Sequence, residues 1–258
     1  MRSDSLSGRT AVVSGGAQGI GAAICHELAD RGMAVVIADV DEAAGEKTAG
    51  LLSDQGFQVL FQSTDIADER SVRASIDRTA DRYGSIDVLV NCAGAFIMRG
   101  VDAEVDDWRT MFDVNVLGYA LMAKHAVPYL RAGGNGSIVN ISSISAFIAQ
   151  PGLTTYSTMK AAVTHLTRML AQELAPQIRV NAVCPGNIYS DNNAAVLRRT
   201  MNLDRAAADQ HPQVGGRAML RRVGDPVEVA RAVAFLASDD ASFITAENLV
   251  VDGGHMTQ

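Results

Sequence analysis

The sequence predicts an α/β fold in which one doubly wound parallel sheet, of about seven strands, carries helices on both faces. Short apolar runs alternate with amphipathic stretches along most of the 258 residues. This alternation is typical of parallel strands that are joined by helices. The runs are apolar at successive positions, as expected of strands covered on both faces. A glycine-rich turn between the first run and the first helical stretch is the third indication, because such a turn opens many α/β sheets.

Each expected strand ends where a polar or glycine-containing segment begins. The strands are expected at Thr10–Ser14, 33–38, 58–63, 86–90, 138–141, 178–183 and 249–251. Gly32, Gly56 and Gly84 end three intervening helices, because glycine readily adopts the left-handed conformation of a C-terminal cap. The expected helices run from the glycine-rich turn to residue 29, over 41–55, from 68 to about 83, from about 105 to about 130 with at most one break, over 156–174 and from 226 to about 237.

The segment 187–222 interrupts this alternation. It is long and polar, and its basic residues are Arg198, Arg199, Arg205, Arg217, Arg221 and Arg222. A long excursion at the carboxyl end of a strand is more often a functional lid than a linker, and a plain surface insertion is the alternative. A helical piece is expected at 194–201. No repeat and no domain boundary is visible, so residues 1–258 are expected to form one domain.

Composition and charge argue against several classes of partner. The formal net charge is −7 at pH 7, so nucleic acid and anionic membranes are poor partners. Three widely spaced cysteines, Cys25, Cys92 and Cys184, favour reduced thiols in the cytoplasm. The polar first residues lead into a strand, and no apolar run approaches the roughly 20 residues that span a bilayer. The histidines do not cluster with carboxylates or cysteines, so no metal site is predicted.

The glycine-rich turn predicts a dinucleotide site. Gly15, Gly19 and Gly21 follow a strand and open a helix, where backbone amides can bind a pyrophosphate. The spacing differs from the commoner G-x-G-x-x-G, and alone it is weak evidence. Asp39 ends the next strand, 18 residues after Gly21. A carboxylate there accepts from a ribose 2′-hydroxyl and repels a 2′-phosphate. We therefore predict NAD rather than NADP, with a simple turn carboxylate as the alternative for Asp39.

A second set of polar residues follows the strand at 138–141. Tyr156 and Lys160 are four residues apart, so on a helix they share one face. A lysine held there is expected to lower the pKa of the phenol from its usual value of about 10, which suits a general acid or base. Ser143 lies at the carboxyl end of the strand, where ligands bind in open α/β sheets. The alternative is a half-buried core tyrosine and a solvated lysine.

With these pieces in hand, the chain resembles the short-chain dehydrogenase/reductase family over essentially its whole length. Residues 14–21 (SGGAQGIG) resemble the family's T-G-x-x-x-G-I-G, and residues 91–94 (NCAG) resemble N-N-A-G with Cys92 in place of an asparagine. The Ser and Y-x-x-x-K motif matches Ser143, Tyr156 and Lys160, with 13 residues between the serine and the tyrosine. Residues 185–190 (PGNIYS) resemble P-G-x-I-x-T, and Asn115 matches the family's catalytic asparagine.

The resemblance implies a Rossmann-type fold that forms a single dinucleotide-binding and catalytic domain. It also implies hydride transfer between NAD(H) and a secondary alcohol or ketone. Tyr156 would be the general acid or base, Lys160 would hold the nicotinamide ribose, Ser143 would polarise the substrate oxygen, and Asn115 would fix a water molecule. The expected cofactor-binding residues are Gly15, Gln18, Gly19, Ile20, Gly21, Asp39, Val40, Asp65, Ile66, Asn91, Ala93, Gly94, Tyr156, Lys160, Pro185, Gly186, Ile188 and Ser190.

The substrate pocket is expected beside the catalytic serine. Its expected residues are Phe96, Ser143, Ser145, Ile148, Gln150, Tyr156 and Asn187. Phe96 and Ile148, together with Tyr189, indicate a largely apolar wall, which weakly favours a secondary alcohol or ketone, cyclic ones included, over a highly hydroxylated sugar. The family resemblance further implies a homotetramer built through 105–130, 156–174 and the last strand. Two alternatives stay open: an NADP-linked carbonyl reductase, and a non-catalytic NAD-binding sensor on the same fold.

Overall fold

Seven strands, among the residues that the structure describes, form one parallel sheet in the order β3-β2-β1-β4-β5-β6-β7. The computed structural model describes residues 4–257, except for the side chains at positions 4 and 192. The strands are β1 (Thr10–Ser14), β2 (Ala34–Asp39), β3 (Val59–Ser63), β4 (Val88–Asn91), β5 (Gly136–Ile141), β6 (Ile178–Pro185) and β7 (Asn248–Val251). The predicted fold class is confirmed, and each strand lies within about two residues of its predicted place.

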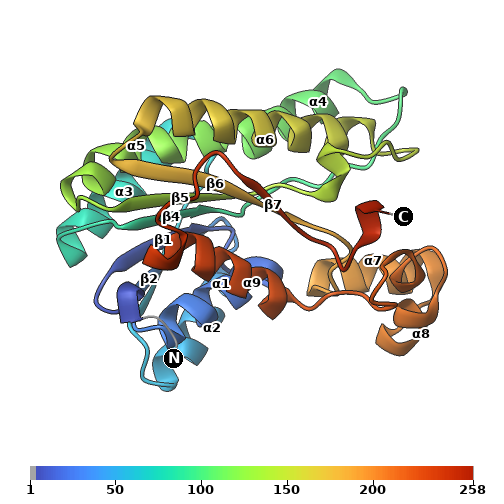
Figure 1. Cartoon of the computed structure of the whole chain (residues 1–258), viewed down its shortest axis with the longest axis horizontal. Helices are drawn as coiled ribbons and strands as arrows, with labels where there is room; N and C mark the ends of the chain where they lie inside the picture. Colours follow the sequence, from blue (N-terminus) through green and yellow to red (C-terminus); the bar gives the residue numbers. More distant parts are fainter. Residues whose placement is uncertain (1–3, 258) are drawn as a thin grey trace.

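Helices cover both faces of the sheet, and Figure 1 shows them as two layers. The α-helices are α1 (Gly19–Asp30), α2 (Glu42–Asp54), α3 (Glu69–Tyr83), α4 (Val105–Phe112), α5 (Gly118–Ala132), α6 (Thr154–Leu174), α7 (Asp191–Met201), α8 (Arg205–Gln210) and α9 (Pro226–Ala237). A π-helical turn, η2 (Asp113–Leu117), joins α4 to α5. Short 3₁₀ turns are η1 (Asp4–Leu6), η3 (Ile144–Ala146), η4 (Gly215–Arg217), η5 (Asp239–Ala241) and η6 (His255–Thr257).

Successive residues of one strand belong to different hydrophobic clusters. Val13 packs in the cluster that holds Ile24 of α1 and Val233 of α9. The preceding residue, Val12, packs in the cluster of α3, α5 and α6, which holds Met122. Side chains alternate between the two faces of a strand, so a strand with both faces covered must be apolar at every position. This explains the continuous apolar runs of the sequence.

The order of strands reverses between β1 and β4, where the candidate site lies. The chain adds β2 and β3 on one side of β1, and then returns to place β4 on the other side. Ser14 at the end of β1 pairs with Asn91 at the end of β4. Ligands bind outside the carboxyl ends of strands at such a reversal. The turns after β1 and β4 are therefore neighbours at this edge.

The excursion after β6 contains more helix than the sequence indicated. The predicted helical piece corresponds to α7, whereas α8 and η4 were not predicted. The excursion returns to its start, because Ile188 and Gly224 form a parallel bridge and the Gly224 amide donates to the Asn187 carbonyl at 2.9 Å. None of the described helices combines the length and the apolar character that a membrane span requires.

Candidate active site

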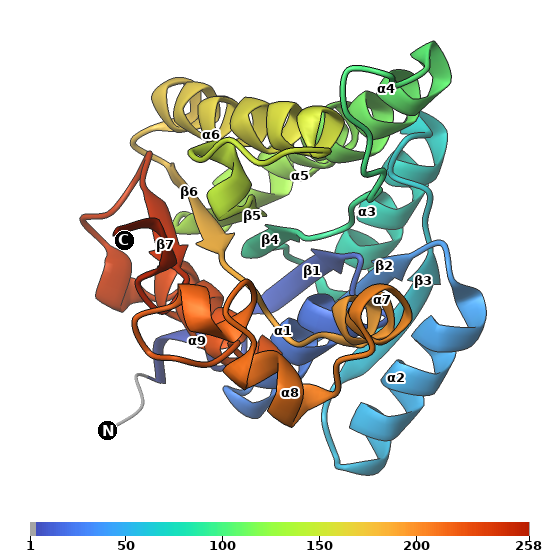
Figure 2. The same cartoon turned by 90° about the vertical axis from the view of Figure 1, so that its right-hand side faces the viewer.

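The candidate catalytic residues gather at the carboxyl end of β5. Figure 2 looks onto this end of the sheet, with α7 and α8 in front of the strands. Helix α6 begins at Thr154, two residues earlier than predicted, because the Thr155 hydroxyl donates to the Ile97 carbonyl at 2.7 Å and fastens this first turn. Tyr156 and Lys160 therefore lie on successive turns of one helix, as the spacing indicated.

Lys160 is almost fully buried, at 5% exposure. Its Nζ donates to the carbonyl oxygen of Ile141 at 3.0 Å, and the hydroxyl of Tyr119 donates to the same oxygen at 3.2 Å. Lys160 Nζ lies 5.8 Å from the centre of the Tyr156 ring. Burial lowers the pKa of Lys160 to about 8, although the nearby thiols of Cys92 and Cys184 raise it slightly. The group therefore stays mostly protonated at neutral pH and loses its proton at about pH 8.

The expected lowering of the Tyr156 pKa is not what the structure shows. Burial raises the pKa of Tyr156, and hydrogen bonding with Ser143 opposes this rise. Lys160 does not lower the pKa of Tyr156 here, because its Nζ donates to the Ile141 carbonyl and lies 5.8 Å from the centre of the ring. In this structure the group that favours the phenolate is therefore Ser143 rather than the lysine.

Two serines at the end of β5 have different tasks. Ser142 donates to the carbonyl oxygen of Lys160 at 2.8 Å and so ties α6 to the strand. Ser143 is buried beside Tyr156, and its Oγ accepts from the amide of Ser145 at 3.1 Å. Its single O–H is the donor in the hydrogen bond with Tyr156 that opposes the rise of the phenol pKa. The structure therefore brings Ser143, and not Ser142, to the phenol, as the spacing predicted.

The π-helical turn η2 presents Asn115 to the same site. Its Nδ2 donates to the carbonyl oxygens of Met111 at 2.9 Å and Ala95 at 3.1 Å. Its Oδ1 is buried and has no hydrogen-bond partner among the described residues. A π-turn leaves backbone groups free in a helix and is frequent at functional sites. A methyl group on Gly94 would lie 3.0 Å from this oxygen and 3.9 Å from Lys160 Nζ, so the three residues face one space.

The glycine-rich turn after β1 touches the turn after β4. Gly15 has φ +69°, and a Cβ on it would lie 2.5 Å from the backbone of Ala93, so only glycine fits there. Ser14 has a hydroxyl group, as the threonine of the family motif does. Its Oγ accepts a hydrogen bond from the amide of Cys92 at 3.1 Å. Burial raises the pKa of the Cys92 thiol to about 12. Cys92 is therefore a neutral side chain in this turn.

The amino end of α1 fits a pyrophosphate. Gln18 is its N-cap residue, but no side chain caps the first amides of the helix. A Cβ on Gly21 would lie 1.9 Å from the carbonyl oxygen of Gly15, so the glycine spacing allows this tight entry into the helix. Uncapped amides at a helix start attract anions. Together with the unpaired Asn115 oxygen, these features fit a bound nicotinamide dinucleotide.

Asp39 closes this turn from β2. Its Oδ2 accepts from the amide of Ala17 at 3.0 Å, and its Oδ1 accepts from the amide of Asp41 at 3.1 Å. The turn-carboxylate interpretation of Asp39 therefore holds in addition to any contact with a ribose. Val40 beside it is 64% exposed. No residue in 15–21 is basic, so no side chain of the turn would neutralise a 2′-phosphate.

The other predicted cofactor residues lie at the same edge with differing exposure. Asn91 is buried, and its Nδ2 donates to Asn140 Oδ1 at 2.9 Å. Asp65 follows β3 on the surface, whereas Ile66 packs in the core against α5. A Cβ on Gly19 would lie 3.5 Å from that of Ser190, so the excursion begins beside the glycine-rich turn. The remaining predicted residues are Ile20 at the start of α1, Pro185 and Gly186 at the end of β6, and buried Ile188.

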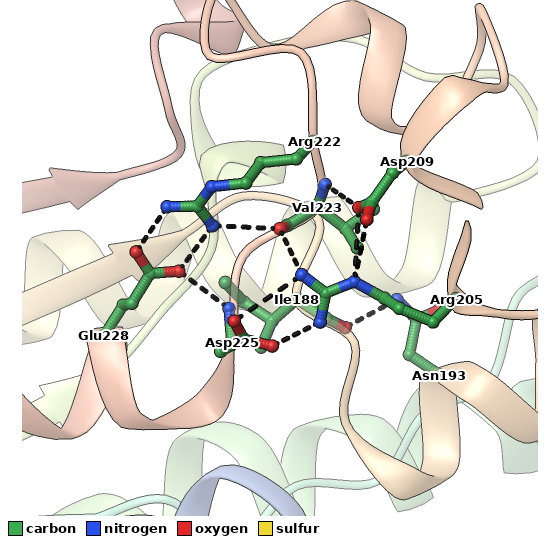
Figure 3. Close-up of polar contacts among 8 residues, drawn as sticks. All are labelled: Ile188, Asn193, Arg205, Asp209, Arg222, Val223, Asp225 and Glu228. Carbon is green, nitrogen blue, oxygen red and sulfur yellow. Dashed lines mark hydrogen bonds and ion pairs between the residues drawn. The ribbon is translucent and has the colours of Figure 1, made fainter. Parts of the chain in front are cut away.

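Ion pairs fasten the excursion to the start of α9 (Figure 3). Arg205 pairs with Asp209 and Asp225, and its Nη2 donates to the carbonyl oxygen of Val223 at 3.2 Å. Arg222 donates to both carboxylate oxygens of Glu228, at 2.8 and 2.6 Å. The Arg222 guanidinium lowers the pKa of Glu228 to about 2. These pairs hold the end of the excursion, residues 222–225, beside Ile188.

Among the predicted substrate residues, the structure places Phe96 and Ser143 against Tyr156. The rings of Phe96 and Tyr156 meet edge to face, with centres 4.7 Å apart. Ser145 donates to Gln150 Oε1 at 2.7 Å, which links the loop after η3 to Ser143. Ile148 lies partly exposed in that loop. Asn187 donates to the carbonyl oxygen of Val214 at 3.2 Å.

Some residues at this edge were not predicted from the sequence. A hollow of about 340 Å³ is lined by the loop 149–153, by Asn187 and by Gln213, Arg217 and His255. The basic composition of 187–222 was the signal that could have indicated Arg217. Tyr119, which shares the Ile141 oxygen with Lys160, also had no signal in the sequence. Within residues 4–257, no three histidine, cysteine or acidic side chains gather as metal ligands would.

Comparisons with known proteins place this geometry in context. A protein-family model described as "Enoyl-(Acyl carrier protein) reductase" matches residues 15–256. Cis-4-hydroxycyclohexanecarboxylate dehydrogenase of Sinomonas cyclohexanicum is 44% identical over 250 residues, which cover 96% of each chain. The trans-4-hydroxycyclohexanecarboxylate dehydrogenase of the same organism is 36% identical over 98% of this chain and 94% of its own. The ligand-free aldohexose dehydrogenase of Thermoplasma acidophilum has a TM-score of 0.89 at 36% identity, covering 98% of this chain and 96% of its own.

Proposed function

Because this chain belongs to the short-chain dehydrogenase/reductase family, we propose that it interconverts a ring-bound secondary alcohol and its ketone with NAD(H). It is a nicotinamide-linked oxidoreductase that acts on CH–OH groups. The observation that carries the proposal is the approach of Ser143 to Tyr156 beside Lys160 and Asn115 at one edge of the sheet. A non-catalytic sensor would have no need of this assembly.

The chain's own residues would orient the substrate and move its proton. The bound nicotinamide supplies the hydride acceptor or donor. Ser143 donates a hydrogen bond to the substrate oxygen, where charge develops. Tyr156 takes the alcohol proton in oxidation and returns one to the carbonyl in reduction. Lys160 keeps a positive charge near the phenol and offers donors for a ribose hydroxyl, while Asn115 Oδ1 can hold a water molecule on the path to solvent.

Asp39 supports NAD as the cofactor. Its carboxylate lies at the end of β2 and already accepts two backbone amides. The approach of a 2′-phosphate would bring like charges together, and no basic side chain in 15–21 would compensate. An NADP-linked carbonyl reductase is therefore the weaker candidate.

The substrate class follows from the wall of the site and from the relatives. Phe96 offers apolar surface beside the phenol, and Ile148 is a partly exposed apolar residue of the loop after Ser143. Two similar proteins are named for cis- and trans-4-hydroxycyclohexanecarboxylate, in which the hydroxyl group sits on a saturated six-membered ring. The aldohexose dehydrogenase, a sugar enzyme by name, is a structural neighbour. We favour the cyclic alcohol because the apolar wall suits a ring without further hydroxyl groups.

The test is a panel of secondary alcohols, with NADH formation followed by absorbance. The panel holds cyclohexanol, both 4-hydroxycyclohexanecarboxylates, an aldohexose and a linear secondary alcohol, each with NAD and with NADP. We expect the cyclic alcohols with NAD to give the highest kcat/KM. Tight NAD binding without turnover of any alcohol would favour the sensor, and faster turnover with NADP would overturn the cofactor assignment.

We also propose a homotetramer in the cytoplasm. Apolar side chains are exposed on the elements that the family resemblance implicates, namely Phe112, Leu117, Met169 and Val250. Strand β7 lies at the edge of the sheet. Cys25, Cys92 and Cys184 are free thiols, which suits a reducing compartment. A light-scattering mass equal to one chain would refute the tetramer.

A further inference from the structure

A polar hollow opens beside the loop that links Ser143 to the helix of Tyr156. Its volume is about 340 Å³, and Gln150, Leu153 and Asn187 line one part of it. Gln150 connects it to the catalytic serine, because Ser145 donates to Gln150 Oε1 and to Ser143 Oγ. Leu153 caps the helix that carries Tyr156. A substrate whose hydroxyl meets Tyr156 could therefore extend into this hollow.

The hollow has a basic lining without an acidic counterpart. Arg217 and His255 line it, and no aspartate or glutamate does. The other arginines near the base of the excursion are engaged: Arg205 and Arg222 pair with carboxylates. Arg217 has no hydrogen bond or ion pair with any described residue, and it is exposed to the hollow's solvent. An unpaired guanidinium in a concave polar site attracts an anion.

The positive charge of Arg217 acts on His255, the buried residue of the hollow's lining. His255 is only 9% exposed. Burial lowers the pKa of His255, the positive charge of Arg217 lowers it further, and Asp252 opposes both. Both oxygens of Asp252 accept backbone amides, from Gly254 and from Met256 at 2.8 Å each. Asp252 is thus engaged in the turn before η6 and leaves the arginine unpaired.

The backbone holds Arg217 in place. The η4 turn that ends at Arg217 is closed by the Ala218 amide, which donates to the Gly215 carbonyl at 3.1 Å, and the Gly216 amide ties it to the His211 carbonyl at 3.0 Å. The Leu220 amide donates to the Gly253 carbonyl at 3.1 Å, and this bond joins the excursion to the segment of His255. The two basic residues therefore face the hollow from two segments that are fixed to each other.

We propose that this hollow binds a carboxylate group of the substrate, with Arg217 as its cationic partner. The inference rests on the proposed function and adds to it the charge of the substrate. One guanidinium matches one carboxylate through two parallel hydrogen bonds. Gln150 has a donor, Nε2, without a partner among the described residues, and it can complete the contact. A phosphate dianion would demand more cationic groups than this lining offers.

The test compares an acid with its uncharged analogues in matched variants. The substrates are cis-4-hydroxycyclohexanecarboxylate and its methyl ester, and the variants are Arg217→Met, Arg217→Lys and Arg199→Met. Arg199 is the control, because it is an exposed arginine of the same excursion that does not line the hollow. We expect Arg217→Met to lose about 10- to 100-fold in kcat/KM for the acid, through KM, and little for the ester. Arg217→Lys should retain part of the preference.

A binding measurement separates failure of this inference from failure of the proposed function. Calorimetry would measure the binding of cyclohexanecarboxylate and of cyclohexanecarboxamide, neither of which can be oxidised at a hydroxyl group, to the NADH-loaded protein. Wild type and Arg199→Met should bind the acid at least about 10-fold more tightly than the amide, and Arg217→Met should not. Equal affinity of wild type for acid and amide, or an unchanged preference in Arg217→Met, would overturn the inference even if the alcohols are oxidised.

Discussion

The Nζ of Lys160 donates a hydrogen bond to the backbone carbonyl oxygen of Ile141 at 3.0 Å. Ile141 ends β5, and Lys160 lies on the second turn of α6, so this bond joins the strand that leads to Ser143 with the helix that carries Tyr156. Tyr119 donates to the same oxygen from α5. Three elements therefore meet at one carbonyl group, and a buried cation is held there without a carboxylate.

This arrangement predicts a dependence of stability on pH. The pKa of Lys160 is about 8 in the folded protein and about 10.4 in an unfolded chain. Between these pH values the unfolded state binds more protons, so stability rises with pH. The gain in stability is complete above pH about 10.4, where the lysine is neutral in both states, and it is lost as the pH falls through about 8. We expect the unfolding free energy of wild type to rise by up to about 3 kcal/mol relative to Lys160→Met over this range.

Denaturant titrations of both proteins, at several pH values from about 7 to about 10.5, measure this difference. The comparison with Lys160→Met removes the contributions of other groups that titrate in both proteins. Parallel stability profiles of the two proteins would contradict the lowered pKa of the lysine.

A second prediction concerns the phenol. Tyr156→Phe should lower kcat by roughly 10²- to 10⁴-fold, because it removes the group that carries the substrate proton. The ring contact with Phe96 does not involve the hydroxyl group, so folding and NADH binding should be retained. Turnover assays and NADH fluorescence titrations test this. Tyr83→Phe, at a partly buried tyrosine of α3, is the control, and full turnover by Tyr156→Phe would exclude the phenol as general acid or base.

Much of the fold could be predicted from the sequence because its signals are local. Apolar runs marked the strands, and Gly32, Gly56 and Gly84 marked helix ends to within two residues. The start of α6 was two residues off because a distant carbonyl group, that of Ile97, fixes Thr155. Helix α8 was missed because its short sequence has no apolar periodicity, and its stability depends on contacts of Arg205 with Asp209 and Asp225.

The site could be predicted from the sequence where its residues follow a fixed spacing. It could not be predicted where tertiary contacts determine a pKa or bring distant residues together. The step from Ser143 to Tyr156 selected the correct serine, because the two side chains are brought together by the loop between β5 and α6. The pKa of Tyr156 was predicted in the wrong direction, because burial and the contact of Lys160 with Ile141 cannot be read from a spacing of four residues. Arg217 and His255 were missed because the hollow exists only once the excursion meets the C-terminal segment.

A third prediction tests the choice of cofactor. Asp39→Asn should raise the ratio of kcat/KM for NADP to that for NAD by about 10-fold or more, because it removes a negative charge that a 2′-phosphate must approach. Asparagine keeps an oxygen that can accept the Ala17 amide, so the glycine-rich turn should persist. Asp41→Asn is the matched control, since Asp41 lies two residues on and caps α2. A wild type that already prefers NADP would contradict the assignment.

The fourth prediction concerns the ion pair that anchors the excursion. Arg222 and Glu228 are 38% and 33% exposed, so water and salt screen their attraction. A double-mutant cycle with Arg222→Met and Glu228→Gln should give a coupling free energy of about 0.5–1 kcal/mol that falls in high salt. Each single variant should also raise KM for the cofactor, because the pair supports residues 222–225, which lie beside Ile188.

The ion pair of Arg31 with Glu27 provides the comparison for this cycle. Its N–O distance of 2.7 Å is similar, but its side chains are only 15% and 6% exposed. Screening by salt is weaker for buried pairs, so the cycle with Arg31→Met and Glu27→Gln should keep its coupling at high salt and leave KM unchanged. Denaturant titrations of both cycles at low and high salt decide the question. The same salt dependence in both pairs would show that exposure does not set the strength of the anchor.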